Sequence, residues 1–269
     1  ALFRLARVLD RWTRLAEIFT RALNDIVVDD PMSARLSYLS AQVFDQRVGD
    51  LTQAALFYRR VLRFDPADRA AASALESVYR RAQAYPELLQ LYSEQIDFAT
   101  SDEERLPLLH KRAAVYETQV DRPEQAIEDY RHILDLAAGD AVAIEALDRI
   151  YTRTERWWDL VELLERRSEG LAPGLPLAEL KHRIAILLAE RLAEKERALE
   201  VFQSVLELGF DHEPTVRFLE GMVQDGAFTA TVAPILESIY RRQDQWKKLV
   251  AILEARVGLS EDRLERYGM

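Results

Sequence analysis

The sequence is built from a long internal repeat. Shifting the chain by 72 positions, called the repeat shift below, places residues 43–95 on residues 115–167 without a gap, and a small residue, Ala54, falls on Ala126 and then on Ala198. The matched apolar residues recur at spacings of three and four, which is typical of one helix face, while the polar residues between them vary. A repeated apolar face with a variable surface predicts a solenoid, in which each unit buries that face against its neighbours.

A second sequence pattern marks the same periodicity and one departure from it. It begins at Ala74 and Ala146, recurs from Ile235, and has a fainter version from Ala1. The copy at Ile235 lies farther from the copy at Ala146 than one repeat shift. The additional residues are enough for a short helix and a turn, so we expect an irregular extra helix near 212–224.

Caps and breakers along the chain predict helices throughout and no strands. The expected ranges are 1–10, 12–25, 33–48, 51–64, 67–83, 86–99, 103–119, 123–137, 140–154, 157–168, 176–192, 195–208, 212–224, 228–243 and 246–257. Short loops force neighbouring helices to be antiparallel. The fold class is therefore all-α, an α-solenoid of antiparallel helix hairpins forming a right-handed superhelix.

We expect one continuous solenoid over residues 1–269, because the period survives along the chain. A turn-rich stretch with two glycines and two prolines makes residues 169–176 a possible joint. Both ends of the sequence fall inside the repeat pattern. We therefore expect the chain to be a fragment of a longer repeat array.

Composition excludes several classes of function. The chain has 269 residues with 36 basic and 46 acidic side chains, a formal charge of −10, and no basic stripe of the kind that phosphate binding requires. Nucleic acid is therefore not an expected partner. The longest apolar stretch is far shorter than the about 20 residues that span a bilayer, so no membrane insertion is expected. The lack of cysteine excludes thiolate chemistry and leaves the compartment open, with the cytoplasm as the default.

One segment resembles a known repeat family. It begins with Gly49-Asp50, continues through Ala54 and the aromatic Tyr58, and closes with Asp65-Pro66. This order resembles the second half of a tetratricopeptide repeat, a two-helix unit with a period of about 34 residues. Later copies keep the Ala and the aromatic residue but lose the Gly and the closing Pro, and the average unit here is slightly longer than that period. The resemblance implies a peptide- or protein-binding solenoid without naming the partner.

The sequence offers no catalytic or metal-binding pattern. No zinc-protease, nucleophile-elbow or phosphate-loop motif occurs. His110 and His182 occupy the same repeat position as Tyr38, so that position accepts a flat ring for packing, and two hairpins separate the imidazoles too widely for a shared metal. We expect a non-catalytic protein with no cofactor and no metal.

Aromatic residues occur at one repeated position and at one unique position. The repeated position is expected to be inter-helix core, and its rings are Trp12, Tyr85, Trp157 and Trp246. Trp158 is the unique case, because its equivalents are small or polar: Thr13, Pro86 and Lys247. Trp158 is therefore expected to be partly exposed and is a candidate partner contact, since Trp is enriched among residues that dominate interface energies. The alternative is that it only covers the adjacent turn.

The resemblance also implies which helix face binds a partner. In tetratricopeptide-like solenoids the first helix of each hairpin lines a concave groove, so the copy-variable positions of those helices are candidates. Leu39, Lys111 and Arg183 form one equivalent set, and Arg112 belongs to a second with Ser40 and Ile184. The cations suit an acidic peptide or a terminal carboxylate. The carboxylate clamp of chaperone-binding relatives is not expected, because it needs several asparagines and the chain has only Asn24.

The preferred interpretation is a non-catalytic scaffold that binds a peptide or protein partner. Its rigid surface loses little entropy on binding. A structural assembly or spacer module is the alternative. RNA binding by a helical repeat is disfavoured by charge, and a helical enzyme would need a deep cavity with convergent ionisable groups.

Overall fold

A computed structural model describes residues 2–24, 31–209, 212–224 and 229–259. All regular structure within these ranges is helical, with α-helices α1 to α15 and a short π-helix, η1. The expected all-α repeat fold is confirmed. None of the described helices is both long and apolar enough to cross a bilayer.

The chain forms two compact units, residues Ala1–Ala146 and Leu147–Met269. The helices up to the boundary are α1 (Leu2–Leu9), α2 (Trp12–Asn24), α3 (Pro31–Val43), η1 (Phe44–Val48), α4 (Leu51–Phe64), α5 (Arg69–Ala82), α6 (Tyr85–Phe98), α7 (Asp102–Thr118) and α8 (Pro123–Leu136). Helix α9 (Ala141–Arg153) spans the boundary. The remaining helices are α10 (Trp157–Glu169), α11 (Leu175–Glu190), α12 (Lys195–Glu207), α13 (Glu213–Gln224), α14 (Thr229–Arg242) and α15 (Trp246–Leu259).

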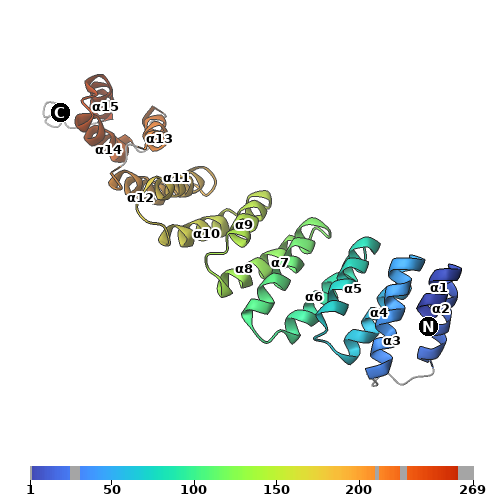
Figure 1. The fold of residues 1–269 in the computed structure, drawn as a ribbon. Coiled ribbons are helices and arrows are strands. Elements are labelled where there is room, and N and C mark those ends of the chain that lie inside the picture. Colours follow the sequence, from blue (N-terminus) through green and yellow to red (C-terminus); the bar gives the residue numbers. More distant parts are fainter. Residues whose placement is uncertain (1, 25–30, 210–211, 225–228, 260–269) are drawn as a thin grey trace. The chain divides into compact units, whose positions relative to one another are not determined.

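Within each unit, consecutive helices pack as hairpins. The pairs with the most extensive contacts are α3 with α4, α7 with α8 and α11 with α12, each a hairpin, followed by α4 with α5 and α14 with α15. In the first unit the helices follow one another side by side in chain order (Figure 1). Helix α13 occupies the segment where the sequence predicts an extra helix, and it packs against α14. The connection between α10 and α11 contains no helix, and its action as a joint stays a prediction.

The turn inside each hairpin uses the same backbone conformation. Residues with positive φ end the first helices of four hairpins at Asp10 (49°), Gln83 (54°), Glu155 (55°) and Asp244 (56°). The three other hairpins have Gly49 (81°), Asp121 (47°) and Ala193 (58°) at the equivalent position. A left-handed residue is a common way to end a helix and satisfy its last carbonyls. The turn is therefore retained where the sequence has lost the glycine.

The repeated apolar positions form the core. The small residues Ala54, Ala126 and Ala198 are fully buried, as the periodicity predicts. An aromatic ring four residues later is buried in each copy, at Tyr58, Tyr130 and Phe202. A small side chain beside a large one allows two helices to approach closely and still fill the space between them.

The repeated ring position is only partly core. Trp12, Tyr85 and Trp157 are half-buried, but Trp246 is 62% exposed, so the core prediction is wrong for Trp246. The reason is the next helix: α2, α6 and α10 are each packed by the first helix of the following hairpin, and no described helix follows α15. Guanidinium groups lie over two of the half-buried rings, Arg47 over Trp12 at 4.9 Å and Arg191 over Trp157 at 5.1 Å.

Candidate functional site: a groove between α5 and α7

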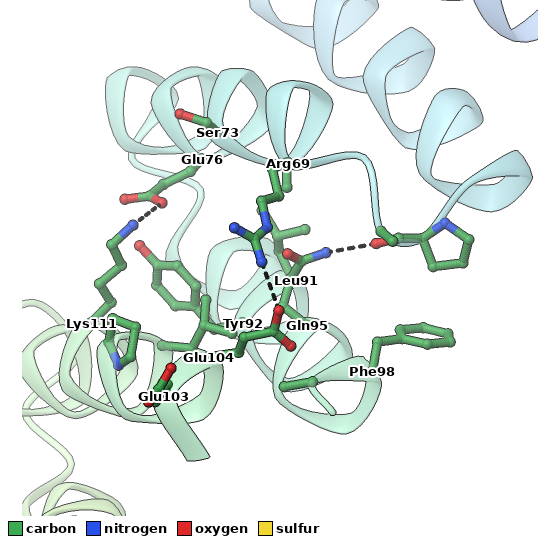
Figure 2. A pocket seen from close by; sticks show the side chains of 16 residues that line it. Arg69, Ser73, Glu76, Leu91, Tyr92, Gln95, Phe98, Glu103, Glu104 and Lys111 are labelled. Carbon is green, nitrogen blue, oxygen red and sulfur yellow. Dashed lines mark hydrogen bonds and ion pairs between the residues drawn. The ribbon is translucent and has the colours of Figure 1, made fainter. Parts of the chain in front are cut away.

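A groove lies between the first helices of two consecutive hairpins in the first unit. Helices α5 and α7 form its walls, and α6, the second helix of the hairpin that begins with α5, forms its floor (Figure 2). The cavity has a volume of about 390 Å³. Two of its three helices, α5 and α7, are first helices of hairpins.

Local capping fixes the two walls. The Asp68 carboxylate accepts hydrogen bonds from the backbone N–H groups of Ala70 and Ala71, each at 2.9 Å, so α5 begins at the groove edge. The Glu104 carboxylate accepts from the backbone N–H of Thr100 at 3.1 Å at the start of α7. The Asp68 bonds satisfy N–H groups that the start of α5 otherwise leaves without partners. The Glu104 bond joins the first turn of α7 to the residue before its N-cap.

Glu76 joins the three helices of the groove. Its carboxylate accepts from Lys111 Nζ on α7 at 2.8 Å and from Arg80 Nε on its own helix at 3.2 Å. Burial alone raises the pKa of Glu76, but the hydrogen bonds from Lys111, Tyr92 and Arg80 outweigh burial and lower it. Burial and the Glu76 charge raise the pKa of Tyr92. Glu76 is therefore an ionised carboxylate with several donors, which holds Lys111 and Tyr92 in place.

A second ion pair crosses the mouth of the groove. Arg69 Nη2 on α5 lies 2.6 Å from Glu104 Oε1 on α7 (Figure 2). The Arg69 side chain is 84% exposed, so this pair adds little to stability. Breaking this ion pair therefore costs little free energy, so a ligand could displace it.

The groove also presents apolar surface. Leu91 and Tyr92 of α6 are buried and make the floor, and Gln95 Nε2 donates to the Pro66 carbonyl at 3.1 Å on one side. Phe98, at the end of α6, lines the groove and is 59% exposed. Phe98 thus adds an exposed phenyl ring to a groove that is otherwise lined by paired charged groups.

The structure places the predicted groove cations in ion pairs. Lys111 lines the groove and binds Glu76, whereas Arg183 on α11 binds Asp148 on α9 in the second unit, at 2.5 and 2.6 Å. The repeat shift carries Glu76 onto Asp148 and Lys111 onto Arg183, so the same bridge between first helices recurs in each unit. The positive charge expected at these positions is already neutralised.

Leu39 and Arg112 are enclosed to different degrees. Leu39, on α3, is half-buried and lies outside the groove. Arg112 Nε and Nη2 donate to Asp129 of α8 at 2.9 and 2.6 Å, and Arg112 Nη1 donates to Ser93 at 2.9 Å. Arg112 thus uses its guanidinium to join α7 to α6 and α8.

Trp158 is the predicted candidate whose side chain is most open to solvent. It lies on α10 in the second unit and is 51% exposed, which agrees with the expectation of partial exposure. Trp158 belongs to the second unit and Lys111 to the first, and Trp158 does not line the groove.

Sequence reasoning missed Glu76 and Phe98. Glu76 was detectable, because the repeat shift places it on Asp148 and so pairs an acid with the Lys111 and Arg183 set. Phe98 had no such signal, since its equivalent is Gly170 and its exposure depends on how α6 ends. A feature present in one copy cannot be found from periodicity.

Two histidines lie close together in the second unit. The rings of His182 and His212 are 5.0 Å apart, and the Nδ1 atoms of both lie 2.9 Å from the Thr215 hydroxyl. Burial lowers the pKa of both imidazoles, and the neighbouring His212 lowers that of His182 further. Among the described residues no three His, Asp or Glu side chains gather as metal ligands.

Comparison with known proteins supports the repeat class. A profile described as tetratricopeptide repeat matches residues 235–267. No curated protein sequence matches the chain. Among solved structures, one titled as Naa15/Naa10 bound to HypK-THB has a TM-score of 0.52 and 15% identity, covering 94% of this chain and 38% of that one.

Two further structures have lower TM-scores. YrrB, titled as a tetratricopeptide protein with an unusual peptide-binding site, has 18% identity and a TM-score of 0.37, covering 75% of this chain and 97% of that one. A tetratricopeptide repeat protein from Parabacteroides merdae has 15% identity and a TM-score of 0.39, covering 88% and 97%. The profile match over residues 235–267, the observed hairpins and the structure with a TM-score of 0.52 support a tetratricopeptide-like helical-repeat fold for this chain. Such folds are typical of protein-interaction scaffolds.

Proposed function

We propose that the protein is a non-catalytic scaffold and that the groove between α5 and α7 binds a peptide segment of a partner protein. The observation that carries this proposal is the cavity of about 390 Å³ with Phe98 exposed along it. The occupant is an extended segment with an apolar side chain that packs on Phe98. Its polar groups meet the Lys111 and Arg69 ion pairs on either side.

The apolar surface, and not free positive charge, determines the ligand. Lys111, Arg112 and Arg183 are each paired with a carboxylate, so an acidic peptide would have to displace those pairs. The same pairing supports a protein ligand over RNA, since the phosphate backbone needs uncompensated cations. A non-catalytic role is supported by the engagement of Glu76 with Lys111 and Arg80, because a carboxylate held by several donors is a poor proton acceptor.

The test is peptide selection followed by mutation of the groove. Peptides selected from a random library on the full chain are measured for affinity by isothermal calorimetry. Phe98→Ser is expected to weaken binding of the selected peptides by about thirtyfold, because truncating an aromatic contact that dominates an interface costs about 2 kcal/mol. Lys111→Glu, which places like charges beside Glu76, is expected to disturb the same site.

A matched control is available in the first unit. Phe64 is also an exposed phenylalanine, at the end of α4, but it does not line the groove. Phe64→Ser should leave the affinity unchanged. Equal loss in both variants, or no loss in Phe98→Ser, would show that the groove is not the binding site.

A structural assembly role is the second candidate, and one observation favours it. Leu5, Val8 and Leu9 of α1 are 56%, 77% and 61% exposed, which leaves an apolar helix face open to a second copy of the chain. Light scattering over a concentration series decides this point. A monomer at all concentrations excludes self-assembly, whereas a dimer that is lost in Val8→Glu supports it.

A further inference from the structure

A second surface feature lies away from the groove, around Trp158 at the start of α10. A pocket of about 310 Å³ opens between α10 and α12. Its lining consists of Trp158, Asp159, Val161, Glu162, Glu165 and Arg197. Helix α11 follows α10 and packs against it, so the exposure of Trp158 is not caused by a missing neighbouring helix.

The charges around this pocket are unbalanced. Asp159 accepts from Arg156 Nε at 2.7 Å, and Glu165 accepts from Arg197 Nη2 at 2.7 Å. Glu162 is exposed and makes no hydrogen bond or ion pair with any residue in the described part of the chain. Asp159 and Glu165 are thus each paired with a guanidinium, and Glu162 leaves the pocket with one negative charge that suits a cation.

The indole ring of Trp158 adds a second attraction for a cation. Arg197 already lies over this ring, with its guanidinium carbon 5.9 Å from the centroid. The face of an aromatic ring attracts cations because its π electrons are negative there, and Trp is the strongest of the aromatic residues in this respect. The contact with Arg197 shows that the Trp158 indole accepts a guanidinium over its face.

We propose that the pocket binds a lysine or arginine side chain of a partner protein, with its charged group between the Trp158 ring and the Glu162 carboxylate. The argument is charge complementarity together with an exposed indole, and neither depends on the groove in the first unit. The partner chemistry is a basic segment, in contrast to the apolar side chain proposed for the groove. Failure of one proposal does not decide the other.

Trp246 provides a control within the same molecule. It is 62% exposed, more than Trp158, but Lys247 and Lys248 follow it directly in the sequence. One helix turn after Trp246 the chain has Val250, where it has Glu162 after Trp158, so that position gives Trp246 no carboxylate. A basic ligand should therefore distinguish two exposed indoles that an apolar ligand would treat alike.

The experiment is fluorine NMR of the full chain labelled with 5-fluorotryptophan, which gives one resonance for each of four tryptophans. Trp158→Phe assigns the relevant resonance. The probe is a peptide with three arginines separated by Gly-Ser, and the reference peptide has glutamine in place of each arginine. At low salt the arginine peptide is expected to shift the Trp158 resonance in a saturable manner and to leave that of Trp246 unchanged.

Substitution and salt complete the test. Glu162→Gln is expected to weaken the arginine peptide by about two- to fivefold, the range for an exposed ion pair, and raised salt should have a similar effect. An equal shift with the glutamine peptide would overturn the proposal, because the contact would then be apolar. An equal shift at Trp246, or full affinity in Glu162→Gln, would also overturn it.

Discussion

The ion pair between Arg112 and Asp129 allows the sharpest test of how the repeats are built. Its side chains are 19% and 7% exposed, and two hydrogen bonds of 2.9 and 2.6 Å join them. In the next copy, one repeat shift further along the chain, the equivalent positions are Ile184 and Val201. An ion pair in one copy thus corresponds to an apolar pair in another, at the same place between the two helices of a hairpin.

This correspondence predicts strong coupling between the two positions. Arg112→Ile alone or Asp129→Val alone leaves one buried charge without its partner, which costs about 3–5 kcal/mol. The double variant reproduces the apolar pair of the next copy and should have a free energy of unfolding within about 1 kcal/mol of the wild type, because well-packed apolar residues can replace a buried ion pair. The expected coupling energy is therefore at least about 5 kcal/mol.

The assay is urea unfolding of the full chain for all four members of the cycle, followed by circular dichroism. Hydrogen exchange localises the effect, because repeat proteins transmit stability mainly between neighbours. Lost protection should be confined to α7, α8 and the adjoining α6, to which Ser93 links Arg112. Single variants that cost less than about 1 kcal/mol, or a double variant as unstable as either single one, would refute the reasoning.

Two further predictions concern the second unit. Ala193 has a φ of 58° where the first copy has glycine, so Ala193→Gly should raise the free energy of unfolding by about 1 kcal/mol. The control, Ala251→Gly inside α15, should lower it by about 1 kcal/mol. If urea unfolding shows no gain in stability for Ala193→Gly, the turn assignment is contradicted. The lowered pKa values of His182 and His212 mean that unfolding takes up protons, so stability is present above a pH of about 6.5 and is lost as the pH falls below it. Urea midpoints measured from slightly alkaline to slightly acidic pH record this loss, and an unchanged pH slope in His182→Gln would refute it.

The fold was predictable because packing constrains many residues in the same way. Ala54, Ala126 and Ala198 are each buried, since a larger side chain would separate the helices. The same small residue therefore recurs at a fixed spacing in the sequence. Helix ends were also predictable, as at α8, where Pro123 begins the helix. Asp121 keeps the positive φ that Gly49 has in the first copy, because the hairpin determines the backbone conformation of its turn.

The candidate site was less predictable than the fold, because it depends on contacts that occur in only one copy of the repeat. The Arg112 prediction identified a variable position but not its partner, which lies on another helix. Contact between His182 and His212 requires α13, which belongs to the irregular part of the array. The exposure of Phe98 and Trp246 depends on which helices pack beside these two side chains. A single sequence does not give that information.

Hydrogen exchange of the full chain with and without a selected peptide tests the central claim most directly. The account predicts that the peptide slows exchange in α5, α6 and α7, the helices that line the groove, and that Phe98→Ser removes this protection. Protection confined to other helices, with exchange in the groove unchanged, would contradict it.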